Sequence, residues 1–376
     1  MMSSLLAAGS IFDTIKQGIN ALCQPHWFLI LSVVALIVFL LGYRRFTKPV
    51  FAIPFAAVCI VFFLASCLDP NFVEIVKKAD NVPIVMMMFA VAFFLWLAFR
   101  QAALNDEATE NGQPLIEAGA DDKVLVWPDL VYIELIALVL CTAFLVVWAI
   151  VLRAPLEQPA DPNVAPNPAK APWYFLGLQE MLVYFDPWLA GVVFPGLIVV
   201  GLIAIPYMDT NPRGNGYYTF KERPFAITTF LFGFLILWVV LIIFGTFLRG
   251  PNWNFFGPYE YWDLHRPMAL LNTEFHDLFW ITLMGRALPT ESWAFVPGYI
   301  IRELPGILLV GAYFVLGPLV LRMLFFRKLY LQMGFVRYGV MSTLMLVMML
   351  MPIKMALRWT LNLHYIVGIT EWFLNV

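Results

Sequence analysis

Eight apolar segments constrain this chain more than any other feature of its sequence. Each approaches or exceeds the ~20 residues that a helix needs to cross a bilayer. The composition agrees, because 62% of the residues are hydrophobic and 13% are charged, against roughly 25% charged in soluble domains. The segments cover about residues 27–43, 50–68, 83–100, 129–152, 187–207, 226–248, 304–325 and 335–353. We therefore predict an all-α integral membrane protein with about eight transmembrane helices.

Basic residues in the short connections predict how these helices are oriented. If the helices alternate in direction, the three most basic connections fall on one side, which the positive-inside rule assigns to the cytoplasm. They hold Arg44, Arg45 and Lys48; Arg213, Lys221 and Arg223; and Arg322, Arg327, Lys328 and Arg337. The long connections 153–186 and 249–303 and both termini then lie on the opposite, positive (P) side. The loop 69–82 fits this less well, because it carries Lys77 and Lys78 on the outer side.

The first of the long connections carries the most distinctive motif of the chain. Six prolines occur from Pro155 to Pro172. Proline fixes φ and removes a backbone donor, so this stretch is neither helix nor regular strand. It runs into the aromatic cluster Trp173-Tyr174-Phe175, with the carboxylate of Glu180 just beyond. We expect a stiff loop at the membrane surface whose aromatic end carries the chemistry.

Three stretches, read in order, resemble a known family. They are WPDLVYIELIALVL from Trp127, LEQPADPNVAPNPAKAPWYFLGLQEML from Leu156, and IPYMDTNPRGNGYYTFKERPFAITTFLFG from Ile205. Over about residues 121–250 they look like subunit IV of the plastoquinol–plastocyanin reductase, the C-terminal half of cytochrome b. The resemblance implies a subunit of a quinol–cytochrome c (or similar acceptor) oxidoreductase. Such a subunit forms part of the P-side quinol-oxidation site and its proton exit.

One departure from the family motif bears on that chemistry. The family has Pro-Glu-Trp-Tyr where this chain has Ala171-Pro172-Trp173-Tyr174, so the motif glutamate is missing. Quinol oxidation releases protons, and a carboxylate with a pKa raised by burial is suited to accept one. We predict that Glu180 is the replacement proton acceptor. The alternative is that Glu180 is a solvated loop residue.

The aromatic cluster and a pair of carboxylates are further site predictions. By the resemblance, Pro172, Trp173, Tyr174 and Phe175 line the quinol pocket; the alternative is an ordinary aromatic belt at the membrane interface. At the cytoplasmic (N) side, Asp129 and Glu134 belong to one apolar segment, and intramembrane acids usually face a cavity or a partner. They form a proton entry to a quinone-reducing site, or Asp129 begins the helix and Glu134 pairs with another subunit.

The chain offers few ligands for metals or haem. The only histidines are His26, His265, His276 and His364, and none lies in the middle of a predicted span. The cysteines, Cys23, Cys59, Cys67 and Cys141, form no CxxC pattern, which disfavours zinc and covalently attached haem. We therefore predict that this chain ligates no haem or other metal.

Cofactors and partners follow from the resemblance. Quinol or quinone binds at a shared site, and the b-type haems and the iron–sulfur cluster belong to partner subunits. The expected partners are a haem-bearing cytochrome b N-terminal-type subunit, a Rieske-type iron–sulfur protein and a c-type cytochrome subunit, together with the lipid bilayer. A net charge of −2 gives no indication of nucleic acid. We expect a multi-pass protein of a bacterial inner, energy-transducing membrane.

Four parts are predicted along the chain. Residues 1–104 hold an N-terminal amphipathic segment and three transmembrane helices, and the N-terminal segment does not read as a cleaved signal peptide. Residues 105–122 form an acidic linker, and residues 123–250 form the subunit IV-like three-helix domain with the quinol-site loop 153–186. Residues 251–376 hold an aromatic loop and two transmembrane helices. The aromatic connection 249–303 either caps its own helices or docks an extrinsic electron carrier.

Two other functions compete with the oxidoreductase reading. One is a structural membrane subunit of an electron-transfer complex without a working quinone site. The other is a transporter, which the absence of an internal repeat disfavours.

Overall fold

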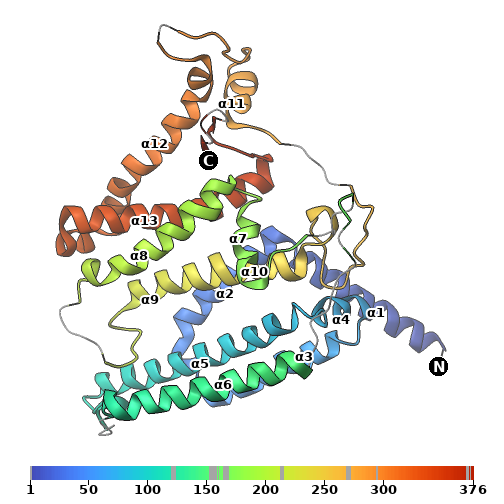
Figure 1. Ribbon diagram of the computed structural model, residues 1–376, viewed down its shortest axis with the longest axis vertical. Helices are drawn as coiled ribbons and strands as arrows, with labels where there is room; N and C mark the ends of the chain where they lie inside the picture. Colours follow the sequence, from blue (N-terminus) through green and yellow to red (C-terminus); the bar gives the residue numbers. More distant parts are fainter. Residues whose placement is uncertain are drawn as a thin grey trace. The chain divides into compact units, whose positions relative to one another are not determined.

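The computed structural model describes residues 2–119, 124–151, 159, 161–163, 169–211, 216–267, 272–293, 295–369, 372 and 374–376, with side chains from residue 12 on. Within these residues eight helices are long and apolar enough to cross a membrane. They are α2 (Pro25–Phe46), α3 (Pro49–Ser66), α5 (Val82–Glu110), η2 with α6 (Val126–Val151), η4 with α8 (Leu189–Met208), the run from α9 to η6 (Pro224–Leu248), α12 (Gly298–Leu324) and α13 (Arg327–Leu361). This confirms the predicted all-α membrane architecture, which Figure 1 shows in sequence order.

Shorter elements connect these helices. They are α1 (Met2–Leu22), α4 (Pro70–Val76), α7 (Leu176–Met181) and α11 (Phe275–Asp277), with 3₁₀ turns η1 (Ile116–Gly119), η3 (Trp173–Phe175) and η7 (Pro251–Trp253) and the π-helical turn η8 (Leu278–Leu283). Two strands, β1 (Gly368–Ile369) and β2 (Leu374–Asn375), pair antiparallel near the C-terminus. Within the spans, η2 (Val126–Leu130) precedes α6 (Val131–Val151), and η4 (Leu189–Val193) precedes α8 (Phe194–Met208). The sixth span is built from α9 (Pro224–Leu231), η5 (Phe232–Val239), α10 (Val240–Ile243) and η6 (Phe244–Leu248).

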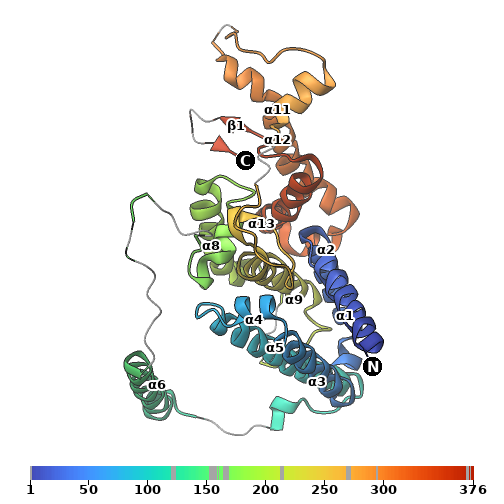
Figure 2. The ribbon, with the colours of Figure 1, turned by 90° about the vertical axis from the view of Figure 1, so that its right-hand side faces the viewer.

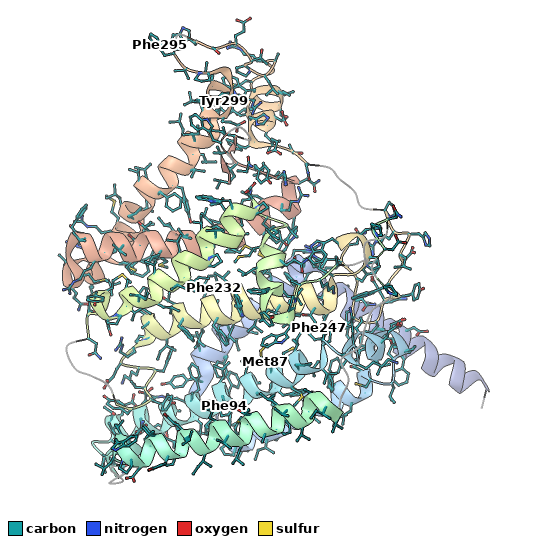
Figure 3. All side chains as sticks on the ribbon, viewed as in Figure 1. Met87, Phe94, Phe232, Phe247, Phe295 and Tyr299 are labelled. Carbon is teal, nitrogen blue, oxygen red and sulfur yellow. The ribbon has the colours of Figure 1, made fainter. Side chains whose placement is uncertain are left out.

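The side chains of the spans are exposed to a degree that a soluble protein does not tolerate. Phe94 of α5 is 63% exposed, and α6 has no buried residue. Figure 3 shows apolar side chains projecting from the helices, Phe94 among them. Lipid is the solvent that such surfaces require.

The chain divides into two compact units. The first contains residues 1–37, 167–214 and 228–376. In it α13 packs against both α12 and α8, and α7 packs against α10 (Figure 1). Leu363, Ile366, Val367 and Ile369 form a buried cluster that packs against side chains of α11, η8, α12 and α13. Strand β1 packs on α12 (Figure 2).

Helix α13 changes direction near its start. Gly334 has a φ of 76°, in the left-handed region that glycine adopts without a steric penalty. The regular part of the helix therefore begins near residue 335, where the sequence predicts the last span to begin.

The second unit contains residues 38–166 and 215–227. Aromatic contacts hold its helices together: the ring centroids of Phe39 and Phe99 lie 5.0 Å apart, and those of Phe63 and Phe89 lie 5.5 Å apart. The indole N–H of Trp96 donates to the carbonyl of Thr47 at 3.0 Å, which fixes the α2–α3 turn against α5.

The acidic stretch after residue 104 begins inside helix α5. Asp106 is 3% exposed and accepts hydrogen bonds from the hydroxyls of Tyr43 and Thr219 and from the backbone N–H of Phe220 and Lys221. The carboxylate thus ties the end of α2 to the loop before α9. Residues 120–122 lie outside the described residues, and the predicted division into four parts stays a prediction.

Candidate functional site

The loop that enters the candidate site is fastened by one glutamine. Gln179 Oε1 accepts from the backbone N–H of Ala171 at 2.6 Å, and its Nε2 donates to the carbonyl of Ala169 at 2.9 Å. Pro172 then begins a 3₁₀ turn over residues 173–175, and α7 follows directly. Proline at this position suits a helix start because its missing N–H has no helical acceptor there.

A buried ion pair lies on the inner face of α7. Glu180 is 0% exposed, and the guanidinium of Arg249 donates from Nη2 to Glu180 Oε1 at 2.7 Å and from Nε to both carboxylate oxygens at 3.1 Å. Arg249 follows the last turn of the sixth span and is 5% exposed. The alternative reading of Glu180 as a solvated loop residue is therefore wrong.

Arg249 also shapes the chain that follows it. Its Nη1 donates to the carbonyl of Trp253 at 2.8 Å, and its guanidinium carbon lies 3.6 Å from the ring centroid of Phe255. Asn252 and Trp253 have φ values of 53° and 56°, in the left-handed region that non-glycine residues rarely adopt. The arginine thus joins the buried carboxylate to a strained turn.

The electrostatics of this pair have opposing parts. Burial raises the pKa of Glu180 above its ordinary value, and the nearby charges of Arg249 and Lys170 act in the opposite direction. Burial opposes the charge of Arg249, but the carboxylate of Glu180 outweighs this, so the pKa of Arg249 is raised. Burial, with the charge of Glu180, also raises the pKa of Tyr184, which is 1% exposed. The carboxyl of Glu180 is therefore subject to two opposing influences, burial and the positive charges beside it, and the phenol of Tyr184 is neutral.

Unlike Glu180, the aromatic side chains of the motif are largely exposed. Tyr174 and Phe175 are 49% and 51% exposed, Trp173 is half-buried, and Pro172 is exposed. The ring centroids of Tyr174 and Phe175 lie 4.8 Å apart. The segment therefore turns its carboxylate inward and presents its aromatic pair outward, so that pocket lining by these four residues stays a prediction.

Asp129 and Glu134 belong to the second unit. Asp129 lies in η2 and Glu134 in the first turn of α6, and both are exposed. Within the described residues neither carboxylate makes a hydrogen bond or an ion pair. Their role in proton entry stays a prediction.

An open cavity of about 390 Å³ lies beside α7 in the first unit. It is lined by Gln179, Leu182, Val183, Trp253, Asn272, Arg358 and His364. Gln179, Leu182 and Val183 come from α7 and the turn after it, and Trp253 is the residue whose carbonyl Arg249 holds. The ion pair behind α7 therefore positions one wall of this cavity.

Residues near the C-terminus form the opposite wall. Arg358 Nη2 donates to Asn272 Oδ1 at 2.8 Å, and His364 Nδ1 lies 3.2 Å from Glu274 Oε1. Sequence reasoning missed Arg249, Arg358 and this role of His364. The one sequence signal for this wall was Lys354, a charged residue directly after a predicted span. In the structure Lys354 is fully buried, and its Nζ donates to the carbonyl of His364 at 2.6 Å.

The histidines have partners other than metal. His276 Nδ1 lies 2.8 Å from Glu303 Oε1, and His265 is exposed beside Asp263. Among the described residues no group of three or more His, Cys, Asp and Glu side chains converges as a metal site would. That this chain ligates no haem stays a prediction.

Comparison with known families adds one finding. Residues 159–259 match the family cytochrome b (C-terminal)/b6/petD. This part of the chain, named the cytochrome b C-terminal segment below, is similar to that family. No solved structure matches the chain. The matched residues include Glu180, Arg249 and Trp253, whereas Asn272, Arg358 and His364 lie beyond them. The segment and the eight helices support a multi-pass membrane subunit of a cytochrome b6f/bc-type complex.

Proposed function

We propose that this chain is a membrane subunit of a quinol–cytochrome c (or similar acceptor) oxidoreductase that forms part of the P-side quinol-oxidation site and its proton exit. The observation that carries the proposal is a fully buried carboxylate, Glu180, within the cytochrome b C-terminal segment and eight residues after Pro172, where the family motif has its glutamate.

The reaction defines what the site must do. Oxidising a quinol to a quinone releases two electrons and two protons. We assign the electrons to an iron–sulfur cluster and a b-type haem, both held by partner subunits. This chain contributes the wall and the proton acceptors, since general bases within reach of the reacting hydroxyls supply that chemistry.

Glu180 suits proton acceptance because burial and the neighbouring Arg249 act on its pKa in opposite directions. Burial favours the neutral carboxyl, while Arg249 favours the carboxylate. A proton taken up by Glu180 removes its charge, and Arg249 keeps the carbonyl of Trp253 as a second acceptor. Protonation therefore does not leave the guanidinium without a hydrogen-bond partner.

The exposed aromatics Tyr174 and Phe175 complete the proposal. Exposed apolar rings beside a bilayer surface fit the apolar ring and tail of a quinol, or the surface of the haem-bearing subunit. Asp129 and Glu134 are assigned to proton entry on the cytoplasmic side, in accord with the basic loops that orient the chain.

Turnover of the purified complex tests the proposal. Glu180→Gln preserves the shape of the side chain and removes the titratable group, so quinol oxidation per assembled complex should fall by ~10²–10⁴-fold. The variant also leaves the buried guanidinium of Arg249 without its counter-ion, so turnover is normalised to the amount of assembled complex. Asp186→Asn is the matched control, since Asp186 is a nearby acid that accepts from Asn375 Nδ2 and the N–H of Trp188. Wild-type turnover in Glu180→Gln across about pH 6–8 would remove Glu180 from the mechanism.

A structural subunit without a working quinone site is the second candidate. It is favoured by Pro172 in place of the motif glutamate and by the engagement of Glu180 with Arg249 at 2.7 Å. The same assay separates the two functions, because a wild-type complex that assembles with its redox partners and oxidises no quinol would support the structural role.

A further inference from the structure

We propose that the cavity beside α7 binds the hydroxylated ring of the quinol and that His364, oriented by Glu274, accepts one of its protons. This inference rests on the proposed quinol oxidation and deepens it. It assigns part of the site to residues 272–274 and 358–364, which lie outside the cytochrome b C-terminal segment.

The lining of the cavity matches a dihydroxylated aromatic ring. Its volume of about 390 Å³ falls in the range of small-molecule sites, ~300–1,000 Å³. Leu182, Val183 and Trp253 offer apolar contact, while the side chains of Gln179 and Asn272 are amides. Arg358 and His364 complete the lining, so three apolar and four polar or charged side chains surround the cavity. Apolar side chains can contact the ring, and polar ones can orient its two hydroxyls.

His364 has the geometry of an oriented base. Its Nδ1 faces Glu274 Oε1 at 3.2 Å, and the other oxygen of Glu274 accepts the backbone N–H of Tyr365 at 3.1 Å. A carboxylate on Nδ1 fixes the tautomer in which Nε2 carries the lone pair and stabilises the imidazolium that forms. The ring is further held against Tyr365, with centroids 3.8 Å apart.

Backbone hydrogen bonds hold His364 and Glu274 in place. His364 N–H donates to the carbonyl of Thr273 at 2.9 Å, Thr273 N–H donates to the carbonyl of Asn362 at 3.1 Å, and Phe275 N–H donates to the carbonyl of Tyr365 at 3.0 Å. These bonds join the chain on both sides of His364 to the chain on both sides of Glu274. A catalytic pair held in this way needs no reorganisation when substrate binds.

Charged and polar groups surround His364 on several sides. The carboxylate of Glu274 lies beside Nδ1, Arg358 lies on the cavity wall, and Lys354 Nζ donates to the carbonyl of His364. The phenol of Tyr365 is neutral, because burial raises its pKa. Glu274 is therefore the group that contacts the imidazole ring of His364 as an acceptor.

In the proposed proton transfer, the O–H bond of one quinol hydroxyl breaks and its proton goes to His364 Nε2. Glu180 does not line the cavity, so the second hydroxyl loses its proton to water, which passes it to Glu180 behind α7. The two electrons would be taken up by the iron–sulfur cluster and the b-type haem that we assign to partner subunits. Two protons thus have two acceptors, one inside the cytochrome b C-terminal segment and one beyond it.

Steady-state oxidation of decyl-ubiquinol by the purified complex tests this assignment. His364→Gln keeps a hydrogen-bonding side chain and removes the base, so kcat should fall ~10²-fold or more, with KM nearly unchanged. Glu274→Gln should lower kcat less, because the amide can still contact Nδ1 but no longer carries the charge that stabilises the ring once it has taken up the proton. His265→Gln, at an exposed histidine, should change nothing.

Separate outcomes overturn the two proposals. A wild-type complex that oxidises no quinol refutes the proposed function. If the wild-type complex oxidises quinol and the His364→Gln variant keeps the wild-type kcat, only the role of His364 is refuted. If His364→Gln does not assemble, Val183→Phe decides: filling the cavity should raise the KM for decyl-ubiquinol at least tenfold, and an unchanged KM would mean that the ring binds elsewhere.

Discussion

Replacing Arg249 by methionine should destabilise the protein strongly, and the structure gives the magnitude. Methionine keeps an unbranched side chain but removes three charge-assisted hydrogen bonds to Glu180 and one to the carbonyl of Trp253. Glu180, which is 0% exposed, is then left without its cation. Removing one partner of a buried ion pair costs about 3–5 kcal/mol, equivalent to two to three powers of ten or more in the unfolding equilibrium.

The loss should depend on pH, and its sign follows from Glu180. Burial already raises the pKa of Glu180, and without Arg249 the raising effect of burial is less opposed. An acid with a raised folded-state pKa contributes no penalty below its unfolded-state pKa, where it is protonated in both states. The penalty then grows as pH rises toward the folded-state pKa, by about 1.4 kcal/mol for each unit of difference. Arg249→Met should therefore be less stable at pH 8 than at pH 5.

Unfolding by SDS in mixed micelles, followed by tryptophan fluorescence at both pH values, measures this. The double variant Glu180→Gln, Arg249→Met removes the buried charge, so it should recover about 2 kcal/mol or more of the loss. Two results would refute the reasoning: a loss below about 1 kcal/mol in the single variant, or a double variant no more stable than Arg249→Met.

Three further predictions concern cofactor content, topology and thiol chemistry. The chain expressed without partners should show no b-type haem absorbance; a stoichiometric bis-histidine haem spectrum would contradict the assignment of haem to partner subunits. A cysteine introduced in 216–223 should react with an impermeant maleimide only from the cytoplasm, and one in 161–163 only from the other side; labelling from one face alone would mean that a span is miscounted. Burial raises the pKa of Cys23 from 9.0 to about 11, so its thiolate fraction at pH 8 should be ~100-fold lower than that of an unperturbed thiol. Stopped-flow alkylation against N-acetylcysteine should show a corresponding slowing, and equal rates would mean that Cys23 is accessible.

The spans were predictable because the hydropathy of a transmembrane helix is a local property. The solvent of such a helix is lipid, so about twenty consecutive apolar residues suffice to identify it, whatever the neighbouring helices are. The last predicted span began near residue 335 for the same reason, and the structure breaks α13 at Gly334. The acidic stretch shows where local reasoning ends: composition indicated a linker, but Asp106 is buried by partners at residues 43 and 219–221.

The candidate site was only half predictable. The motif and its missing glutamate directed attention to Glu180, and burial of that residue agrees with a special role. Its partner lies 69 residues away at the end of another span, where an arginine reads as an ordinary interfacial charge. The cavity was equally hidden, because its walls come from residues 179–183, 253, 272 and 358–364.

The sequence by itself determined that this protein has about eight membrane-spanning helices and a segment similar to the C-terminal part of cytochrome b, since apolar length and an ordered set of motifs are both local properties of the chain. Only the tertiary structure decided that Glu180 pairs with Arg249, that Gln179, Leu182 and Val183 line a cavity beside α7, and that His364 lies next to Glu274. The physical reason is that an ion pair, a cavity and an oriented base each depend on distances between side chains far apart in sequence, and those distances exist only once the helices have packed.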